Sequence, residues 1–597
     1  MVMKYSITEN LQDRKGVISN LHCFLNRHMD TGFKSKWSGF WSPPYKFMDY
    51  YAIKVNGVWL GENTVEAAEY GDEMIFHHET DSLRITEEVS APSTTPGVSL
   101  KLHFENKMEE KKAVHVALEP GVDIRDKGTD IDETEYKTEQ GPNRVTVSRN
   151  GKKLMISSQE DFKLTGGSFT KTHEPGETQK CFIPGHISFR KELETQSDLE
   201  IEVTTSKGVF GELQDIEQSF EGEDLGRLFN YSLESVKNLI YDGENTGVIA
   251  GHPWFQSFWA RDSFWTVLGL IDAGYFELSE DILTNFAEKG LPGKINLDGE
   301  DEYRGFPRSD TAPLFIIAVN KLERHFRSND IIEEAKEQAL ERLEFDEEEL
   351  VDHAPGGTWM DTLERENAVD IQSLWLKAAD LEDLEIESKL ESGLEKFEGE
   401  NYMKDSLAEN SAETINPAIP LMYEQIKPEK ASRYLQKING EFSSRFGART
   451  RSITDPGYES SGYHTGSTWG LTTCWAAAAN LSYGKEKIGK GILKKLNQFL
   501  DRGQLGALPE VVDSEKGHSL GCSEQAWSAG MALHVIDSYL LGIKVENTSK
   551  IIIDPCKDLN CVRTGKRVGD QEIDINVSDG EVEVLNDPDI KIELRGE

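Results

Sequence analysis

Apolar and polar side chains alternate along the first third of the chain. The alternation is clearest in three segments, 98–104, 114–118 and 199–203, where Val, Leu, Ile or Phe recurs at every second position. A period of two is typical of strands that bury one face and expose the other. The sequence therefore predicts β structure over residues 1–215.

Two Asn-Gly pairs interrupt this region. Asn56-Gly57 and Asn150-Gly151 each lie between apolar alternating runs, and Asn-Gly favours two-residue hairpin turns because both residues tolerate positive φ. Seven or more antiparallel strands predict a β-sandwich. Nothing in this region concentrates the residues of a catalytic site, so we interpret it as a scaffold or a substrate platform.

Near residue 216 the hydrophobic period changes from 2 to 3.6, which indicates amphipathic helices. The first helix is expected to start near Glu223, and the eighth is the least regular because it contains Pro417 and Pro420. The pattern predicts twelve helical segments, near 223–241, 262–274, 277–289, 311–325, 330–345, 368–380, 382–398, 415–425, 428–439, 465–483, 485–501 and 521–541.

Short and long connections alternate between these twelve segments. Six helical hairpins arranged in this way predict an (α/α)6 toroid barrel over residues 216–545, with its long loops at one mouth. The tail, 546–597, returns to the period of strands, and Asp579-Gly580 between alternating runs predicts another hairpin. We expect this tail to form a small C-terminal β appendage packed on the barrel.

Two acidic residues fall in long loops of the predicted barrel. Asp361 follows Trp359 and Met360 between the fifth and sixth helices, and Glu510 lies between the eleventh and twelfth. Because these loops open at one end, we expect both carboxyls to face one cavity. Glycosidic hydrolysis requires such a pair: one group protonates the leaving oxygen while the other attacks C1 or deprotonates a water. Desolvation beside Trp359 would raise the pKa of Asp361, as a general acid needs.

Aromatic and polar residues gather in the same loops and at the helix starts that follow them. Aromatic planes stack on pyranose rings, and Arg-Asp pairs make charge-assisted hydrogen bonds to sugar hydroxyls. The candidate substrate-binding residues of this kind are Trp254, Trp259, Arg261, Asp262, Asp310, Trp359, His464 and Trp469.

Several of these residues also have a structural interpretation. Asp262 and Asp310 could be N-caps, since Asp is favoured there. Trp527 could be a core residue or a sugar platform. Glu524 is the rival of Glu510 as catalytic base, although an acidic residue at a helix start is also a favourable cap.

The charge of the chain limits its partners. The 597 residues include 106 acidic against 65 basic residues, a formal net charge of −41. Such a chain repels phosphate backbones and anionic lipids, so we expect no nucleic-acid and no membrane partner. The acidic residues are spread along the whole chain, and salt screening eases their repulsion. We interpret this as a halophilic source, with an ordinary acidic cytosolic enzyme as the alternative.

Localisation and cofactors follow from what the sequence lacks. The N-terminal residues contain no apolar leader and no run of 18 apolar residues occurs, so a soluble, cytoplasmic protein is expected. Six scattered cysteines match no zinc-ligand spacing, and neither a metal nor an organic cofactor is implied. The oligomeric state stays open.

The loop motifs resemble, in order, those of the amylo-α-1,6-glucosidase domain of glycogen-debranching enzymes. The resemblance covers about residues 250–540 and rests on the stretches 253–264, 309–311, 358–361, 369–375, 463–469 and 521–528. It implies an (α/α)6 barrel that hydrolyses α-1,6-linked glucosyl branches of glycogen or limit dextrin with inversion. It also implies Asp361 as general acid and Glu510 as general base. The sugar-binding shell that it implies is Arg261, Asp262, Asp310, Trp359, Gln372 and His464.

Two positions depart from the family pattern, and alternatives remain. Asp370 replaces a glutamate and Thr465 replaces a glutamine, where the distal glucose is expected to be recognised. Residues 1–215 are too short for a second, transferase domain. The layout is shared with glucoamylases and trehalases, so an exo-acting α-1,4-glucosidase or a trehalase is the alternative. A phosphorylase or a non-catalytic polysaccharide-binding protein on this scaffold is a further one.

Overall fold

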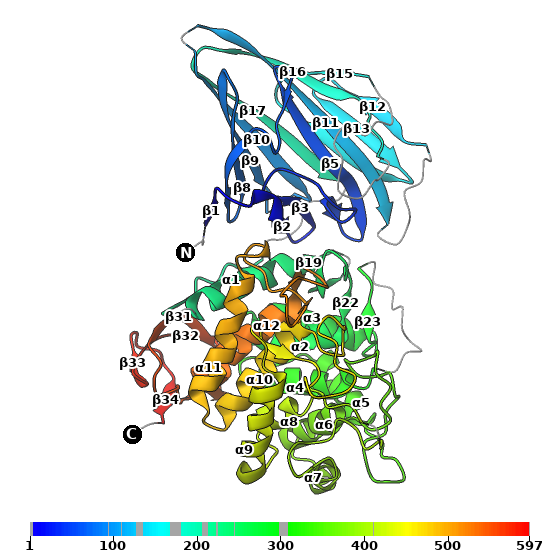
Figure 1. Cartoon of the computed structure of the whole chain (residues 1–597), viewed down its shortest axis with the longest axis vertical. Coiled ribbons are helices and arrows are strands. Elements are labelled where there is room, and N and C mark those ends of the chain that lie inside the picture. Colours follow the sequence, from blue (N-terminus) through cyan, green and yellow to red (C-terminus); the bar gives the residue numbers. More distant parts are fainter. Residues whose placement is uncertain are drawn as a thin grey trace. The chain divides into compact units, whose positions relative to one another are not determined.

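The computed structural model describes residues 4–93, 95–108, 110–126, 135–166, 181–205, 213–222, 225–243, 245–297, 308–409 and 411–595 (Figure 1). The chain forms two compact units. The first comprises Met1–Leu213 with Tyr241–Gly243 and Arg502–Leu505, and the second comprises Gln214–Ile240, Glu244–Asp501 and Gly506–Glu597.

The described residues of the first unit form two nine-stranded sheets. The first sheet is wholly antiparallel. It runs in the order β1 (Tyr5–Ile7), β7 (Val65–Tyr70), β8 (Met74–Glu79), β9 (Leu83–Ser90), β10 (Gly97–Asn106), β17 (Gln196–Thr205), β14 (Lys152–Ser157), β13 (Arg144–Arg149) and β12 (Lys137–Gln140). The second runs in the order β15 (Lys163–Thr165), β16 (His186–Leu193), β11 (Lys112–Asp126), β5 (Tyr45–Val55), β4 (Gly39–Ser42), β3 (Cys23–His28), β2 (Arg14–Asn20) and β26 (Gly503–Gln504), with β6 (Val58–Trp59) paired to β5.

One hydrophobic core contains side chains of both sheets. Leu100 and Leu102 of β10 share this core with Val114 and Val116 of β11, which explains the alternation seen in the sequence. The predicted hairpin turns are confirmed: Asn56 has φ 49° between β5 and β6, and Asn150 has φ 47° between β13 and β14. The antiparallel β architecture predicted for this region is therefore present.

All twelve predicted helices exist in the second unit. Their bounds are α1 (Leu225–Leu239), α2 (Ala260–Asp272), α3 (Phe276–Glu288), α4 (Thr311–Glu323), α5 (Asp330–Leu340), α6 (Val369–Leu381), α7 (Glu387–Glu395), α8 (Ala418–Met422), α9 (Pro428–Lys437), α10 (Gly470–Ser482), α11 (Glu486–Lys494) and α12 (Ala526–Val535).

The even-numbered helices form a closed inner ring. Each contacts the next in the order α2, α4, α6, α8, α10 and α12, and α12 contacts α2. Every residue of α2, α8 and α12 is buried, whereas α1, α5 and α11 bury one face. A helix that is apolar all round lies inside, and an amphipathic helix covers it. The burial thus separates an inner ring from an outer layer.

Two glycines allow α2 and α12 to approach closely. A Cβ atom on Gly269 would lie 2.1 Å from the carbonyl oxygen of Gly530, and a Cβ atom on Gly530 would lie 2.6 Å from the Cα atom of Thr266. Any larger side chain at either position would force the two backbones apart. The ring therefore closes at a point where only glycine fits.

Connections into the inner helices are long, and connections out of them are short. Residues 341–368 lead into α6 and residues 495–525 lead into α12, whereas 273–275 and 483–485 leave α2 and α10. Long loops consequently gather at the N-terminal ends of the inner helices.

The start of two helices differs from the prediction. α10 begins at Gly470 rather than at 465, and α12 begins at Ala526 rather than at 521. Short strands precede both: β25 (Thr468–Trp469) pairs with β24 (Ala448–Arg449) and β27 (Val511–Val512), and β28 (Glu524–Gln525) pairs with β21 (Gly251–His252). These pairings use backbone groups that a helix would need.

The C-terminal strands contact helix ends in the second unit. One sheet contains β18 (Ser219–Glu221), β31 (Cys561–Val568), β32 (Gln571–Ser578) and β33 (Glu581–Val584), and another contains β29 (Ile543–Asn547), β30 (Lys550–Ile553) and β34 (Lys591–Leu594). The predicted turn at Asp579 has φ 51°.

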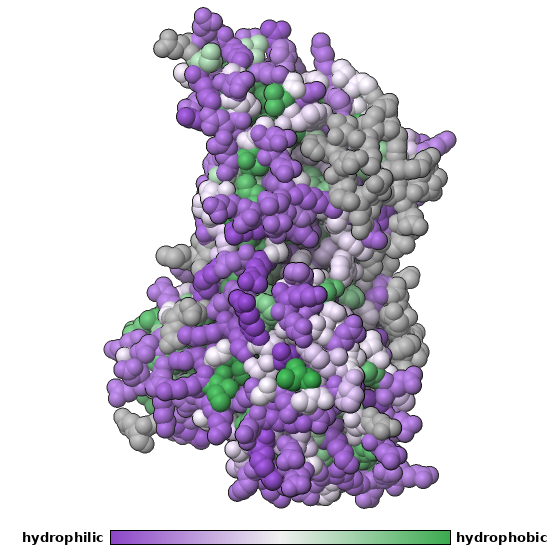
Figure 2. Space-filling view, viewed as in Figure 1, coloured by the Kyte–Doolittle hydropathy of each residue, from purple (hydrophilic) through white to green (hydrophobic). Residues whose placement is uncertain are grey.

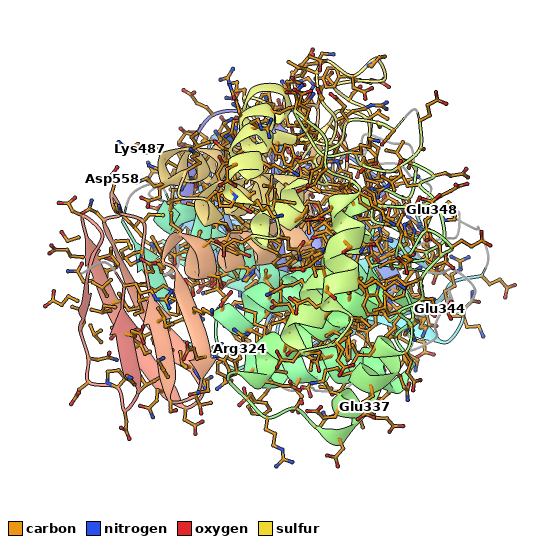
Figure 3. All side chains as sticks on the ribbon, turned by 90° about the horizontal axis from the view of Figure 1, so that it is seen from below. Arg324, Glu337, Glu344, Glu348, Lys487 and Asp558 are labelled. Atoms are coloured by element: carbon orange, nitrogen blue, oxygen red, sulfur yellow. The ribbon has the colours of Figure 1, made fainter. Side chains whose placement is uncertain are left out.

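Two kinds of ion pair hold these strands to the helices. At the surface, Lys487 of α11 pairs with Asp558 at 3.4 Å (Figure 3). In the interior, Lys566 of β31 is fully buried and its Nζ lies 3.4 Å from Asp272, the last residue of α2. A buried charge is tolerated only when it is paired, so the deeper contact fixes the strand more strongly than the exposed one.

The exposed surface is hydrophilic and acidic. Figure 2 shows predominantly hydrophilic residues on the visible face, and Glu337, Glu344 and Glu348 extend into solvent near α5 (Figure 3). Among the described residues, no helix is long and apolar enough to cross a lipid bilayer.

Because repulsion among exposed carboxylates destabilises the folded chain, salt should stabilise it. Raising KCl from about 0.1 M to about 1 M shortens the Debye length from about 10 Å to about 3 Å. We expect the melting temperature to rise by about 4 °C or more over this range, measured by circular dichroism. An unchanged or lower melting temperature would show that surface repulsion does not limit stability.

Candidate active site

An open pocket of about 410 Å³ lies at the N-terminal ends of the inner helices. The residues that line it are Phe255, Trp259, Arg261, Asp262, Trp359, Asp361, Tyr463, His464, Trp469, Glu510, Gln525 and Trp527.

Three helix starts supply much of this lining. Trp259, Trp469 and Gln525 are the residues immediately before α2, α10 and α12. Helix N-termini carry unpaired N–H groups and a positive partial charge. The pocket therefore receives a field that favours negative charge, which suits the carboxylates around it.

Glu510 is almost fully buried at the pocket wall, with 2% of its surface exposed. Its Oε1 accepts a hydrogen bond from the Tyr463 hydroxyl, and its Oε2 accepts one from the Cys522 N–H at 2.9 Å. Burial raises the pKa of Glu510, the two donors lower it, and the charge of Asp361 raises it. Both oxygens thus face donors, an arrangement that an ionised carboxylate satisfies.

Gly521 leaves the space that this carboxylate occupies. A Cβ atom on Gly521 would lie 2.2 Å from Oε2 of Glu510. Its φ is not positive, so the constraint is steric and does not concern the backbone conformation.

Asp361 lines the same pocket from the connection between α5 and α6. Its side chain is 37% exposed, and its Oδ2 accepts a hydrogen bond from Arg308 Nη1 at 3.2 Å. Met360 and Trp359 beside it are buried. Asp361 therefore has the apolar neighbours expected from the sequence, but it also contacts the guanidinium of Arg308.

A second buried carboxylate, Asp262, lies between Glu510 and an arginine. Its Oδ1 accepts from Gln525 Nε2 at 2.8 Å. Burial is the main cause that raises the pKa of Asp262 to about 8; Arg261 lowers it and Glu510 raises it further. Asp262 lies within α2, so it is not the N-cap.

Arg261 links α2 to two other parts of the site. Its Nε lies 3.3 Å from Asp310 Oδ2, and its Nη1 donates to the Thr358 carbonyl at 2.8 Å. Asp310 occupies the N-cap position of α4 but makes no side-chain cap hydrogen bond. Its carboxylate orients Arg261 instead.

Aromatic rings form much of the remaining wall. Trp359 meets His464 and Trp469 edge to face, with centroids 5.3 and 5.5 Å apart, and its Nε1 donates to Asn416 at 2.7 Å. Burial, with Arg261 and the more distant Arg365, lowers the pKa of His464 to about 3. His464 is therefore a neutral polar group at physiological pH.

Three buried polar atoms of the lining have no hydrogen-bond partner among the described residues. They are Nη2 of Arg261, Oε1 of Gln525 and Nε1 of Trp527. Buried polar groups are nearly always satisfied, so these two donors and one acceptor are available to a polar ligand such as a sugar.

Three candidate substrate-binding residues do not line the pocket. The side-chain amide of Gln372 hydrogen-bonds to the backbone: it accepts from the Val351 N–H and donates to the Leu390 carbonyl. Trp254 is 39% exposed. Asp310 is buried behind Arg261. These three residues therefore lie outside the pocket lining, and their part in substrate binding stays a prediction.

The rival base Glu524 and the two positions that depart from the family pattern, Asp370 and Thr465, also lie outside the pocket lining. Glu524 accepts from Ser235 Oγ at 2.9 Å and does not line the pocket. Asp370 forms a buried ion pair with Arg365 at 2.9 Å, and Thr465 is also absent from the lining. The two positions that depart from the family pattern therefore lie outside the pocket lining.

The pocket also contains Phe255, Tyr463 and Gln525, which are absent from the predicted set, and Trp527, for which the sequence left a core role and a sugar-platform role open. All four lie within the motif stretches 253–264, 463–469 and 521–528. Loop neighbours could have been included for that reason, but the sequence does not show which of two adjacent side chains faces a ligand.

The fold and the paired acidic residues in one pocket define a glycoside hydrolase. The chain matches the family model of amylo-alpha-1,6-glucosidase over residues 233–534, about half of its length, and it belongs to this family. No curated protein matched this chain.

Solved structures are similar to this chain at low sequence identity. A bacterial glucoamylase complexed with acarbose covers 90% of this chain and 97% of its own, with TM-score 0.57 and 12% identity. A GH63 mannosylglycerate hydrolase from Thermus thermophilus in complex with glucose covers 51% of this chain and 99% of its own, with TM-score 0.41 and 16% identity. The first likeness shows that the fold is glucoamylase-like.

The steric role of Gly521 gives a specific prediction. Gly521→Ala should displace the Glu510 carboxylate and lower glycosidase activity by about 100-fold, because displacements near 1 Å cost about that much. Activity and melting temperature should be measured together.

Gly491→Ala in α11 is the matched control, since a Cβ atom there would meet nothing within 4 Å. It should retain full activity. Equal activity of Gly521→Ala and wild type would show that the carboxylate does not need its present position.

Proposed function

We propose that this protein is an inverting α-glucosidase that removes α-1,6-linked glucosyl branches from glycogen or limit dextrin. The observation that carries the proposal is the joint presence of Asp361 and Glu510 in one pocket of a chain that belongs to the amylo-alpha-1,6-glucosidase family. In this proposal the helical ring is an (α/α)6 barrel, and the pocket is its mouth.

The two carboxyls have complementary roles in the proposed reaction. Asp361 donates its proton to the glycosidic oxygen as the bond from C1 to that oxygen breaks. Glu510 accepts a proton from a water molecule whose oxygen attacks C1 from the opposite face, so an α-linked substrate gives β-glucose. Since Arg308 contacts Oδ2 of Asp361, we assign the transferred proton to Oδ1.

Glu510 suits the base role better than Glu524 does. A base must be ionised and must reach the water, and Glu510 has a donor on each oxygen and lines the pocket. The Glu524 side chain accepts from Ser235 instead. This supports Glu510 as the residue that activates water.

The pocket lining supports recognition of one glucosyl residue. Trp359 and Trp469 offer apolar surface to the pyranose ring. Arg261, Gln525 and Trp527 offer unpaired donors and an acceptor to its hydroxyls. Asp262 fits a hydrogen bond to a further hydroxyl, because burial raises the pKa of this group to about 8 and so keeps the neutral form available.

An exo-acting α-1,4-glucosidase is the second candidate. The similarity to a bacterial glucoamylase favours it. A terminal glucosyl residue presents the same hydroxyls to the pocket whether it is joined to O4 or to O6 of the next residue, so the same pocket suits both substrates. Trehalase activity on the same scaffold is a further alternative.

A substrate panel tests the proposal. Branched limit dextrin or isomaltose, maltotriose and trehalose should be supplied separately at equal concentration, and released glucose should be measured. We expect release mainly from the α-1,6 substrates, with β-glucose as the first anomer by NMR. Faster release from maltotriose would support the second candidate, and α-glucose would reject inversion.

Variants of the two carboxyls test their roles. Asp361→Asn and Glu510→Gln should each lower kcat by about 100-fold or more, consistent with the loss of a general acid or base. Each should keep the melting temperature within a few degrees of wild type. Near-normal turnover in either variant would reject its assignment.

The pH dependence of kcat/KM reports on Glu510. Because the base must be ionised, activity is lost as pH falls through its pKa, which burial holds above the ordinary value. Tyr463→Phe removes a donor that favours the anion, so the pKa should rise further and the acidic limb should move to higher pH. A shift of about one to two pH units is expected, given about 1.5–3 kcal/mol for a charged hydrogen bond. An unmoved acidic limb would show that this limb does not report Glu510.

A further inference from the structure

Three exposed apolar side chains surround the loop that carries Glu510. Large apolar residues with more than a third of their surface exposed are few among the described residues, and three of them adjoin this loop. They are Trp254 at 39%, Tyr463 at 37% and Leu520 at 38% exposed. Single exposed apolar residues need no explanation, but exposed apolar residues that gather beside a pocket suit a ligand with apolar faces.

Trp254 lies on a tight turn that is tied to the pocket. Phe255 N–H donates to the Gly251 carbonyl at 3.0 Å and closes the turn. The Ser523 N–H donates to the His252 carbonyl at 3.1 Å, two residues before Trp254, and the neighbouring Cys522 N–H donates to Glu510. The segment 522–523 therefore joins the turn to the proposed base.

The two neighbours on this turn differ in environment. Phe255 lines the pocket and meets Trp259 edge to face, with centroids 6.2 Å apart. Trp254 does not line the pocket and remains the exposed residue of the turn. A rigid turn thus presents an indole ring to solvent directly beside the pocket residue Phe255.

Leu520 approaches the same loop from another side. Its N–H donates to the Val511 carbonyl at 3.0 Å, and Val511 follows Glu510 in the chain. Tyr463 reaches Glu510 itself through its hydroxyl. Trp254, Tyr463 and Leu520 are here called the rim, because each belongs to a segment that hydrogen bonds tie to the loop carrying Glu510.

We propose that the rim binds the glucan chain outside the pocket, with Trp254 as the stacking platform for a glucosyl residue further along the chain than the one joined directly at the scissile bond. In the proposed function the pocket takes the terminal glucosyl residue, and a branched glucan carries further residues that must lie outside it. The apolar faces of those pyranose rings fit an exposed indole. This inference rests on the proposed function and extends it from the terminal residue to the remainder of the chain.

The experiment compares a short and a long substrate. Isomaltose presents one residue outside the pocket, and a glucosyl-branched maltodextrin presents several. Trp254→Ala should lower kcat/KM for the branched dextrin about three- to tenfold more than for isomaltose, mainly through KM, because aromatic stacking contributes about 0.5–1.5 kcal/mol. Trp254→Phe should restore most of the difference, since it returns an aromatic face.

Ile488→Ala supplies the matched control. Ile488 is 43% exposed on α11, so its removal tests the loss of any exposed apolar side chain. It should change neither substrate's kinetics. Leu520→Asn should lower the ratio of the two kcat/KM values in the same direction as Trp254→Ala, by a smaller factor.

The outcomes separate this inference from the proposed function. If wild type releases glucose from both substrates but Trp254→Ala lowers both equally or neither, the rim proposal is overturned and the function stands. If Trp254→Ala changes the oligomeric state by light scattering without changing the ratio, the indole is a contact between copies of the chain, and the proposal is again overturned. If wild type hydrolyses neither substrate, the proposed function itself fails.

Discussion

The contact between Gly269 and Gly530 sets the geometry on which the rest of the second unit depends. These residues bring α2 and α12 so close that a Cβ atom on either would collide with the opposite backbone. Since α2 is the first and α12 the last inner helix along the chain, the contact between them closes the ring. At the start of these two helices, Nε2 of Gln525 donates a hydrogen bond to Oδ1 of Asp262 at 2.8 Å. A pair of small residues in the helix packing thus fixes a hydrogen bond at the pocket.

The buried carboxylates of the second unit differ in whether a cation pairs with them. Away from the pocket, several buried carboxylates are paired with cations: Arg365 contacts both Asp370 and Asp405, and Lys566 contacts Asp272. In the pocket, Glu510 has only neutral donors, and its pKa is raised. An unpaired buried carboxylate costs stability, and such a cost is typical of sites where a shifted pKa serves chemistry. The paired network supports the wall, and the unpaired group faces the ligand.

Most of the fold could be predicted because it follows from local periodicity and turn chemistry. Twelve helical patterns and three Asn-Gly or Asp-Gly turns correspond to elements of the structure. Side-chain direction in the loops could not be predicted, because it depends on pairings between distant segments. In β28, adjacent residues point to opposite faces, so Gln525 lines the pocket while Glu524 meets Ser235 on α1. One position decides between a ligand contact and a packing contact.

The same reasoning bears on linkage selectivity. Asp370 and Thr465, which depart from the family pattern, lie outside the pocket lining, so they act on a ligand only through the wall that they support. A terminal glucosyl residue offers the same hydroxyls to the pocket whether its C1 is joined to O4 or to O6 of the next residue. Discrimination must then arise from contacts made by that next residue in the transition state. Under the proposed function, the residues that decide the linkage are therefore those that meet this next residue, and not those that hold the terminal one.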